Sequence, residues 1–255
     1  MIFSIEDGLL TESQAQLSLQ SESLQFGYGL FETMKAVKSR VFLLKQHIQR
    51  LIISAEKIGL PIEKTGQEIE TFVNNALQQI PNSHHRIKLL LIKEGLFLIC
   101  SELSKGFQKE SIRLYPYKAS RSIPEIKSLN YMDCQIAFSR AEHEGFDDAL
   151  LYKKIITEAS RGNLFWVQNK QLFTTTKNAL PGITQNFIMD HWPSVTTTQI
   201  SLKQLLDADE VFYTNSIQGV CPVTQIGNVQ FEIGTLTIEI QAFYKSAEFQ
   251  SEQSS

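Results

Sequence analysis

The sequence predicts an α+β fold in two halves of similar size, and three observations indicate it. The 255 residues include 42% hydrophobic residues, enough to form a sizeable core in one large domain or two modest ones. Patterns typical of helices and of strands alternate along the chain. A polar stretch, KASRSIPEIKS at Lys118–Ser128, interrupts these patterns near the middle. We therefore expect an N-terminal domain of residues 1–117 and a C-terminal domain of residues 118–255.

The N-terminal half is predicted to combine strands with two helices. LFETMKAV (Leu30–Val37) and RVFLL (Arg40–Leu44) read as two strands around a short turn. From residue 44 to residue 58, apolar side chains recur every three or four positions, which predicts an amphipathic helix that ends at Gly59. A second helix is expected from about Thr65 to Gln79. Three further strands are expected at Arg86–Ile92, Leu96–Ser101 and Ser111–Tyr117.

The C-terminal half is predicted to open with a helix over Tyr131–Glu144. A second helix is expected to begin at Thr184, because LPGIT places a glycine turn directly before a threonine that can cap a helix. A closing helix is expected over Gly234–Glu248. The strands are expected near Ala149–Tyr152, Leu164–Val167, Gln171–Thr174, Ala208–Ser216 and Cys221–Gly227.

Composition argues against several classes of protein. A formal net charge of −3, from 24 basic and 27 acidic residues, indicates neither a nucleic-acid-binding surface nor a membrane-binding surface. Cys100, Cys134 and Cys221 are far apart, and no histidines are spaced as HxxxH, so neither a disulfide framework nor a metal site is predicted. Glu6 and Asp7 stand where a signal peptide would need a basic segment, and we therefore expect a cytoplasmic protein.

No single short motif reveals the chemistry. FGYG at Phe26–Gly29 lacks the third glycine of the dinucleotide fingerprint and precedes a strand, so a Rossmann fold is not expected. Neither a P-loop nor a GxSxG elbow is present. Taken singly, Lys127, Glu158 and Arg50 would be ordinary surface charges. They would be functional only if they belonged to one site, and composition and periodicity do not show whether they do.

Five segments in succession resemble one enzyme family. FGYGLFETMKAVKSRVFLLKQHIQRLIISAEKIGLPI resembles the opening of class IV aminotransferases, the fold-type IV enzymes that depend on pyridoxal 5′-phosphate (PLP). Later segments resemble the remaining motifs of that family: EIKSLNYMDCQIA, DDALLYKKIITEASRGNLFWV, ALPGITQNFI and ADEVFYTNSIQGVCPVTQIG. The chain is accordingly identified as a member. The resemblance implies a two-domain α+β fold like that of D-amino-acid aminotransferase, with PLP between the domains, a small-molecule substrate and a homodimer.

The resemblance implies roles for three charged residues. Lys127 falls on the lysine that bonds covalently to PLP, and a lysine can supply the neutral amine for this when it is desolvated in a pocket. Glu158 falls on the acid that faces the pyridine nitrogen and keeps the ring protonated. Arg50 falls on an arginine that binds the phosphate, and a guanidinium fork suits that dianion.

Five further residues are expected around the cofactor by the same resemblance. Ile183 and Thr184 fall on a turn whose backbone N–H groups receive the phosphate, and a helix N-terminus is a natural anion site. Ser216 falls on a hydroxyl-bearing position at the phosphate. Tyr131 is expected to hydrogen-bond the phenolic oxygen of PLP. Asn163 either supports these residues or is purely structural.

The chain departs from the family pattern at two places that bear on the substrate. Gly27-Tyr28-Gly29 replaces the usual Gly-Asp-Gly, and Lys93-Glu94-Gly95 stands where transaminases often carry an Arg-Gly pair that engages a substrate carboxylate. The residues that bind substrate carboxylates stay open, with three candidates by charge and segment: Lys35, Arg86 and Lys93.

The missing Arg-Gly pair, the short chain and the lyase-like KSLN at Lys127–Asn130 favour 4-amino-4-deoxychorismate lyase, which makes the folate precursor 4-aminobenzoate and pyruvate. The alternative is an aminotransferase that acts on a D-amino acid or a branched-chain amino acid. A non-catalytic protein that keeps the fold only for binding would be expected to lack Lys127 or Glu158, and both are present.

Overall fold

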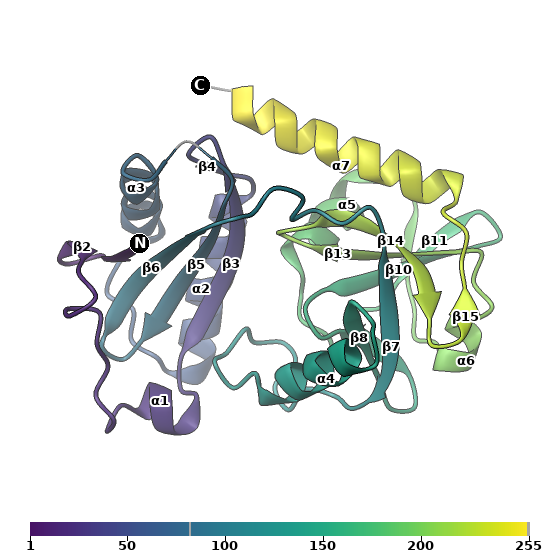
Figure 1. The fold of residues 1–255 in the computed structure, drawn as a ribbon, viewed down its shortest axis with the longest axis horizontal. Coiled ribbons are helices and arrows are strands. Elements are labelled where there is room, and N and C mark those ends of the chain that lie inside the picture. The colour runs from purple at the N-terminus through teal and green to yellow at the C-terminus, as the bar shows by residue number, and fades with distance from the viewer. Residues whose placement is uncertain (82, 254–255) are drawn as a thin grey trace. The chain divides into compact units, whose positions relative to one another are not determined.

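The computed structural model describes residues 1–81 and 83–253, which form two compact units (Figure 1). Unit 1 consists of Met1–Phe107, Ile126–Asn130 and the end of the last helix from Gln250. Unit 2 consists of Gln108–Glu125 and Tyr131–Phe249. The chain therefore leaves unit 1, returns to it for five residues that include Lys127, and leaves it again.

Unit 1 is built on an antiparallel six-stranded sheet with the order β2-β1-β6-β5-β3-β4. Its strands are β1 (Ile2–Ser4), β2 (Gly8–Leu10), β3 (Leu30–Val37), β4 (Arg40–Val41), β5 (His85–Ile92) and β6 (Gly95–Glu102). Its helices are α1 (Glu22–Phe26), α2 (Leu44–Ile58) and α3 (Gly66–Leu77). The longer strands and the two longer helices confirm the expectations for this half of the chain.

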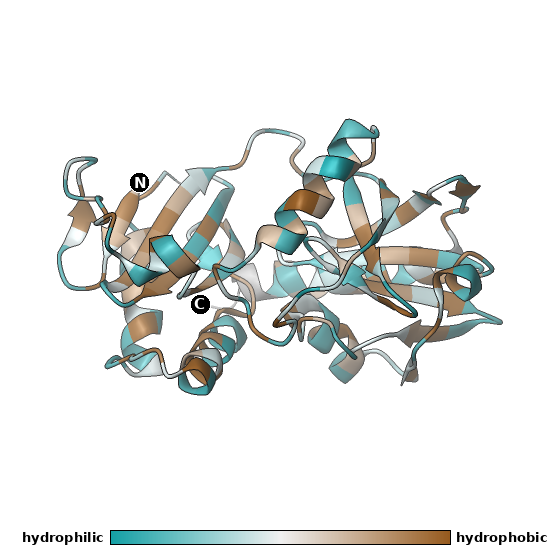
Figure 2. Ribbon diagram, turned by 90° about the horizontal axis from the view of Figure 1, so that it is seen from below, coloured by the Kyte–Doolittle hydropathy of each residue, from teal (hydrophilic) through white to brown (hydrophobic). Residues whose placement is uncertain are grey.

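The core of unit 1 lies between the sheet and the helices α2 and α3. Even-numbered residues of β3, such as Leu30 and Met34, are buried in one cluster with Ile48 and Leu51 of α2. Odd-numbered residues of β3 point to the other face, because side chains alternate along a strand. Figure 2 shows the resulting mixture of apolar and polar residues along the strands.

Local signals set the ends of both helices in unit 1. Gly59 ends α2 in the left-handed region, with φ +69°, where a residue without a side chain is favoured. Thr65 and Glu68 form a capping box at the start of α3, in which each side chain accepts a hydrogen bond from the backbone N–H of the other.

Unit 2 is built on a mixed nine-stranded sheet with the order β12-β11-β10-β13-β14-β7-β8-β9, with β15 paired to β14. Its strands are β7 (Ile112–Lys118), β8 (Asp148–Tyr152), β9 (Ile156–Ala159), β10 (Asn163–Gln168), β11 (Gln171–Thr174), β12 (Val195–Thr197), β13 (Glu210–Asn215), β14 (Gly219–Ile226) and β15 (Val229–Gln230). Its helices are α4 (Met132–His143), α5 (Ile183–His191), α6 (Leu202–Leu205) and α7 (Thr235–Gln253). None of the described helices is both long enough and apolar enough to cross a bilayer.

Two features of unit 2 differ from the sequence-based expectations. The strand Ser111–Tyr117 was expected in the first half, but β7 pairs in parallel with β8 and β14, and these distant partners place it in unit 2. The expectation that Thr184 caps a helix is wrong. Gly182 is the N-cap of α5 and Thr184 lies within the first turn, where its hydroxyl is 3.4 Å from that of Tyr244.

Candidate active site

Lys127 is carried by a short strand-like segment that pairs with β3 of unit 1. The backbone N–H of Phe31 donates to the carbonyl of Lys127 (3.0 Å), and that of Leu129 donates to the carbonyl of Gly29 (2.8 Å). Between them, Ser128 pairs with Leu30 in an antiparallel bridge. The Nζ atom of Lys127 lies 4.6 Å from the centroid of the Phe31 ring. Sheet-type hydrogen bonds therefore fix the position of this lysine on unit 1.

The loop before β3 requires glycine where it passes the lysine segment. A Cβ on Gly29 would lie 2.7 Å from Cδ1 of Leu129 and 2.9 Å from Cγ2 of Ile92, which is closer than real Cβ atoms approach. Tyr28, which stands where the family usually has Asp, donates a hydrogen bond from its hydroxyl to the carbonyl of Ile58 at the end of α2 (2.8 Å). Tyr28 thus ties this loop to α2.

Arg50 lies beside a buried carboxylate that the sequence did not bring to attention. Its Nε and Nη2 atoms donate to the two oxygens of Glu32 on β3, at 2.8 and 2.6 Å. Nδ1 of His47, one turn earlier on α2, lies 2.7 Å from the same carboxylate. Glu32 and His47 are each only 1% exposed. The expected role of Arg50 at a phosphate stays a prediction, and Glu32 takes two of its five N–H donors.

The protonation states of this cluster follow from its surroundings. Burial would raise the pKa of Glu32, but Arg50 and His47 lower it to about 2. Burial lowers the pKa of His47 below its usual 6.5, against the hydrogen bond to Glu32. At pH 7 we therefore expect an ionised Glu32, a charged Arg50 and a neutral His47 that donates from Nδ1.

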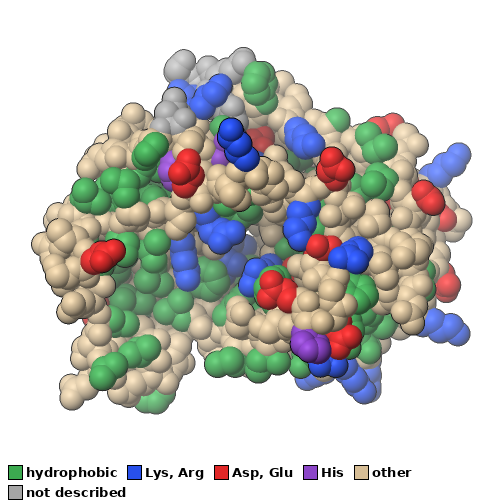
Figure 3. Space-filling view, viewed as in Figure 1, with side chains coloured by type: hydrophobic (Ala, Val, Ile, Leu, Met, Phe, Trp, Pro, Cys, Tyr) green, Lys and Arg blue, Asp and Glu red, His purple; other side chains and the backbone are tan. Residues whose placement is uncertain are grey.

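The face of the unit 1 sheet opposite α2 carries three cations, Lys35, Arg86 and Lys88, which we call the cationic face. Lys35 on β3 is the direct cross-strand partner of Arg86 on β5, and Lys88 lies two residues farther along β5. Like charges directly opposite one another destabilise a sheet. Figure 3 shows Lys and Arg side chains beside an apolar area on the face of unit 1 turned to the viewer.

Lys88 was not among the residues expected from the sequence. Its Nζ atom lies 4.7 Å from the centroid of the Phe31 ring, the same ring that Lys127 approaches. Burial lowers its pKa, and no carboxylate of the described residues is within ion-pair distance of it. Strand alternation could have predicted this position, because it places Lys88 on the same face as Arg86. The candidate Lys93 instead lies in the exposed β5–β6 turn, 3.0 Å from Glu22.

Glu158 is a buried carboxylate on β9 of unit 2. Its Oε2 atom accepts a hydrogen bond from the backbone N–H of Leu180 (3.1 Å), and its Oε1 atom lies 3.5 Å from Nη1 of Arg121. Arg121 is also buried and donates to the carbonyl of Pro124 (2.8 Å). Its guanidinium carbon lies 5.3 Å from the ring centroid of Tyr131. Sequence reasoning missed Arg121, because it lies in the polar stretch that looked like a linker.

Tyr131 directly precedes α4 and is held by the chain next to Glu158. Its hydroxyl donates to the carbonyl of Ser160 (2.8 Å), and the Ser160 hydroxyl donates to the buried carboxylate of Asp148. Burial raises the pKa of Tyr131 well above its usual value. Tyr131 is therefore a neutral hydrogen-bonding group at pH 7, and its expected contact with PLP stays a prediction.

The N-terminus of α5 has the properties of an anion site. Ile183 and Thr184 are buried in its first turn, where backbone N–H groups have no partner within the helix and the helix dipole is positive. Asn163 on β10 donates from Nδ2 to the carbonyl of Leu180 (2.8 Å), just before this turn. Ser216 lies in the turn after β13, where the side-chain oxygen of Asn215 accepts hydrogen bonds from the backbone N–H groups of Ile217 and Gln218.

Each unit thus carries part of the expected site. Unit 1 holds Lys127 together with Arg50, and the charge of Lys127 contributes to lowering the pKa of His47. Unit 2 holds the other expected site residues, and within it Glu158 and Asn163 both hydrogen-bond the backbone of Leu180. The other members on unit 2 are Tyr131, Ile183, Thr184 and Ser216.

Comparisons with known proteins identify the family to which the chain belongs. A family model described as amino-transferase class IV matches residues 29–226. One similar solved structure is that of a Legionella pneumophila protein, whose assignment as a 4-amino-4-deoxychorismate lyase is itself provisional. Its TM-score is 0.81 and its sequence is 28% identical, with 92% of this chain and 97% of that chain covered. Branched-chain amino acid aminotransferase 1, mitochondrial, of Humulus lupulus is 29% identical, with 91% of this chain and 70% of that protein covered.

D-alanine aminotransferase of Staphylococcus epidermidis is 24% identical, with 93% of this chain and 94% of that protein covered. The observed α+β architecture is the one expected from the sequence, and the family model spans most of the chain. On these grounds the chain belongs to the class IV aminotransferases, the PLP-dependent enzymes of fold type IV.

Proposed function

We propose that this enzyme is a PLP-dependent 4-amino-4-deoxychorismate lyase, which forms 4-aminobenzoate and pyruvate. The observation that carries the proposal is the cationic face on unit 1. The proposed substrate has two carboxylates, whereas leucine and alanine have one. Lys35, Arg86 and Lys88 offer more positive charge than a single carboxylate needs.

The chemistry of the described residues fits PLP. A buried carboxylate, Glu158, suits a protonated ring nitrogen, and the N-terminus of α5 suits a phosphate. A Cβ on Gly182 would overlap the amide oxygen of Asn163, so the turn just before this helix requires glycine. When bound, PLP would supply a ring that accepts the electron pair left when a bond to the substrate's Cα breaks.

The chain's own residues supply the remaining steps of the proposed reaction. Lys127 takes the proton from Cα of the substrate as general base. Glu158 keeps a proton on the ring nitrogen, and Arg121 beside it stabilises the ionised carboxylate. The pyruvate group then leaves by β-elimination as the substrate ring becomes aromatic. Lys88 and its neighbours on the cationic face hold the two carboxylates.

A class IV aminotransferase is the second candidate, and the similarity to a branched-chain aminotransferase and to a D-alanine aminotransferase favours it. Both reactions begin with removal of the Cα proton. They differ at the end, because an aminotransferase keeps the amino group after one half-reaction and needs a 2-oxo acid to remove it. A cytoplasmic location and a homodimeric assembly belong to the same proposal and rest on the sequence and on the resemblance.

The deciding experiment supplies 4-amino-4-deoxychorismate to the purified enzyme without any 2-oxo acid. We expect repeated turnover, with 4-aminobenzoate and pyruvate formed in equal amounts. Leucine, D-alanine and D-glutamate should be poor amino donors to 2-oxoglutarate. No 4-aminobenzoate, together with steady transamination of one of these amino acids, would replace the lyase by the aminotransferase.

A matched pair of variants tests the cationic face. Lys88→Met should raise KM for 4-amino-4-deoxychorismate by at least about tenfold, because a charge-assisted contact is lost. Lys93→Met changes an exposed lysine of the same hairpin, and it should leave KM unchanged. Equal effects of the two substitutions would remove the cationic face as support for the proposal.

A further inference from the structure

One short turn connects the two ends of the expected cofactor site on unit 2. The backbone N–H of Leu180 donates to Oε2 of Glu158 (3.1 Å), and its carbonyl accepts from Nδ2 of Asn163 (2.8 Å). Two residues later, Gly182 is the N-cap of α5. The position of the acid relative to the anion site therefore depends on the turn Leu180–Gly182.

Asn163 is in contact with both ends of this turn. It is the first residue of β10, where pairing with Thr214 of β13 fixes its backbone, and it is 5% exposed. Besides the hydrogen bond to Leu180, its amide oxygen occupies the space that a Cβ on Gly182 would need. A rigid strand residue thus holds the turn at its first and its last position.

We propose that Asn163 is a positioning residue that sets the distance between the carboxylate of Glu158 and the N-terminus of α5. The inference rests on the proposed function, in which PLP binds through a ring nitrogen and a phosphate. A ligand with two binding groups gains affinity only when both protein sites match the spacing of those groups. Asn163 acts through Leu180 and Gly182 and supplies this match.

The test compares three probes on the full-length apoprotein: PLP, pyridoxal, which lacks the phosphate, and inorganic phosphate, measured by competition with PLP. In Asn163→Ala, PLP should bind at least about tenfold more weakly. Pyridoxal and phosphate should each change by less than about threefold, because each uses one end of the site. The absorption maximum of bound PLP should also shift as the contact of the ring with Glu158 changes.

A second variant guards against misfolding of the first. Asn163→Leu keeps the approximate shape of the side chain, adds no charge beside the anion site and lacks the Nδ2 donor, and it should show the same preferential loss for PLP. Gln225→Ala is the matched control. It removes a side-chain amide that donates to the carbonyl of Gly227 (2.7 Å), outside the turn. It should lower the melting temperature and leave the three dissociation constants within about twofold.

The packing of Asn163 against Gly182 provides a compensation test. Gly182→Ala places a methyl group against the amide oxygen of Asn163, and it should weaken PLP binding. Adding Asn163→Ala removes the overlap, so the double variant should bind PLP more tightly than Gly182→Ala alone. Additive losses would refute the assigned contact.

Each other outcome is decisive. Equal losses for all three probes would mean that Asn163 only supports the fold, and equal losses for PLP and pyridoxal would mean that it contacts the ring directly. Unchanged binding of PLP would also overturn the inference. Failure of the parent protein to bind PLP would instead refute the proposed function.

Discussion

The substitution Glu32→Gln should destabilise unit 1 by an amount that the structure sets. Glu32 is 1% exposed and bonds Arg50 and His47. Its pKa falls from an ordinary 4.5 to about 2. At about 1.4 kcal/mol per pKa unit, the ionised carboxylate stabilises the fold by about 3 kcal/mol at pH 7. Glutamine resembles the protonated acid in size and should lose this contribution.

The pH dependence has a definite sign. Because the folded-state pKa is the lower one, the stabilisation is fully present above pH 4.5 and is lost as the pH falls toward 2. The difference between the parent and Glu32→Gln should therefore be constant from pH 7 to pH 5. At pH 3 it should shrink to about 1.5 kcal/mol.

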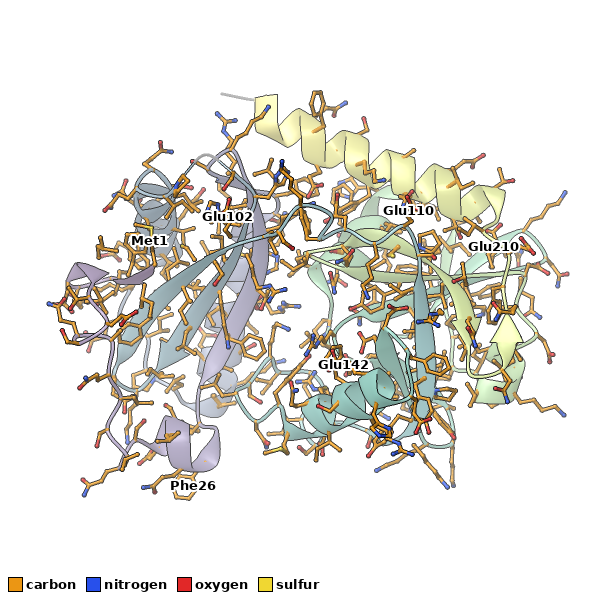
Figure 4. The ribbon with its side chains drawn as sticks, in the orientation of Figure 1. Met1, Phe26, Glu102, Glu110, Glu142 and Glu210 are labelled. Carbon is orange, nitrogen blue, oxygen red and sulfur yellow. The ribbon has the colours of Figure 1, made fainter. Side chains whose placement is uncertain are left out.

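Hydrogen exchange measured by mass spectrometry is the suitable assay. Both tryptophans, Trp166 and Trp192, lie in unit 2, so their fluorescence does not report on unit 1. Peptides from α2 and β3 should exchange about two orders of magnitude faster in Glu32→Gln at pH 7. As a control we choose Glu102→Gln, at the end of β6 (Figure 4) and exposed, with an expected effect within about 0.5 kcal/mol. Unchanged exchange of α2 and β3, or a difference that stays constant down to pH 3, would refute the reasoning.

Three further predictions concern single residues. Burial lowers the pKa of His47, so the free energy of unfolding of the parent should decrease as the pH falls below 6.5. In His47→Asn, urea unfolding followed by circular dichroism should show a smaller decrease from pH 6.5 to pH 5. The same pH dependence in parent and variant would contradict this prediction. Gly29→Ala should lower the stability of unit 1 by about 1–3 kcal/mol through contact with Leu129. Gly66→Ala in α3 should be neutral or stabilising in thermal unfolding, because its Cβ would make only ordinary contacts with Ile52 (3.6 Å) and Ile48 (3.7 Å). Arg121→Met should destabilise unit 2 by about 3 kcal/mol, because buried Glu158 loses a neighbouring charge. Urea unfolding followed by tryptophan fluorescence measures this loss. A change in the free energy of unfolding of less than about 0.5 kcal/mol would argue against the pairing of Arg121 with Glu158.

Elements with strong local signals were predictable from the sequence. The stripe of apolar residues in α2 and its terminal Gly59 marked that helix, and Thr65 with Glu68 marks the start of α3. The strands of Ile2–Ser4 and Ile156–Ala159 carry no such signal. They are short, and β1 forms by pairing with β6, which lies about a hundred residues farther along the chain.

The same distinction applies to the site. Lys127 and Glu158 were expected only through resemblance, because nothing in their local sequence distinguishes them from surface charges. Glu32 had a readable signal, since it occupies the same face of β3 as Leu30 and Met34, and a charge at a core position needs a partner. Its partner, Arg50, comes from another element, and that pairing is not visible in a linear pattern.

The five residues that return to unit 1 also shield a sheet edge. The N–H of Phe31 and the carbonyl of Gly29 would be exposed at the start of β3 without the segment Ile126–Asn130. Unpaired backbone groups of this kind are templates for association between chains. A fragment that ends at Phe107 would lack this cover as well as Lys127. The segment that carries Lys127 therefore also protects unit 1 against self-association, and unit 1 cannot be isolated as one continuous piece of chain without losing both that lysine and the cover.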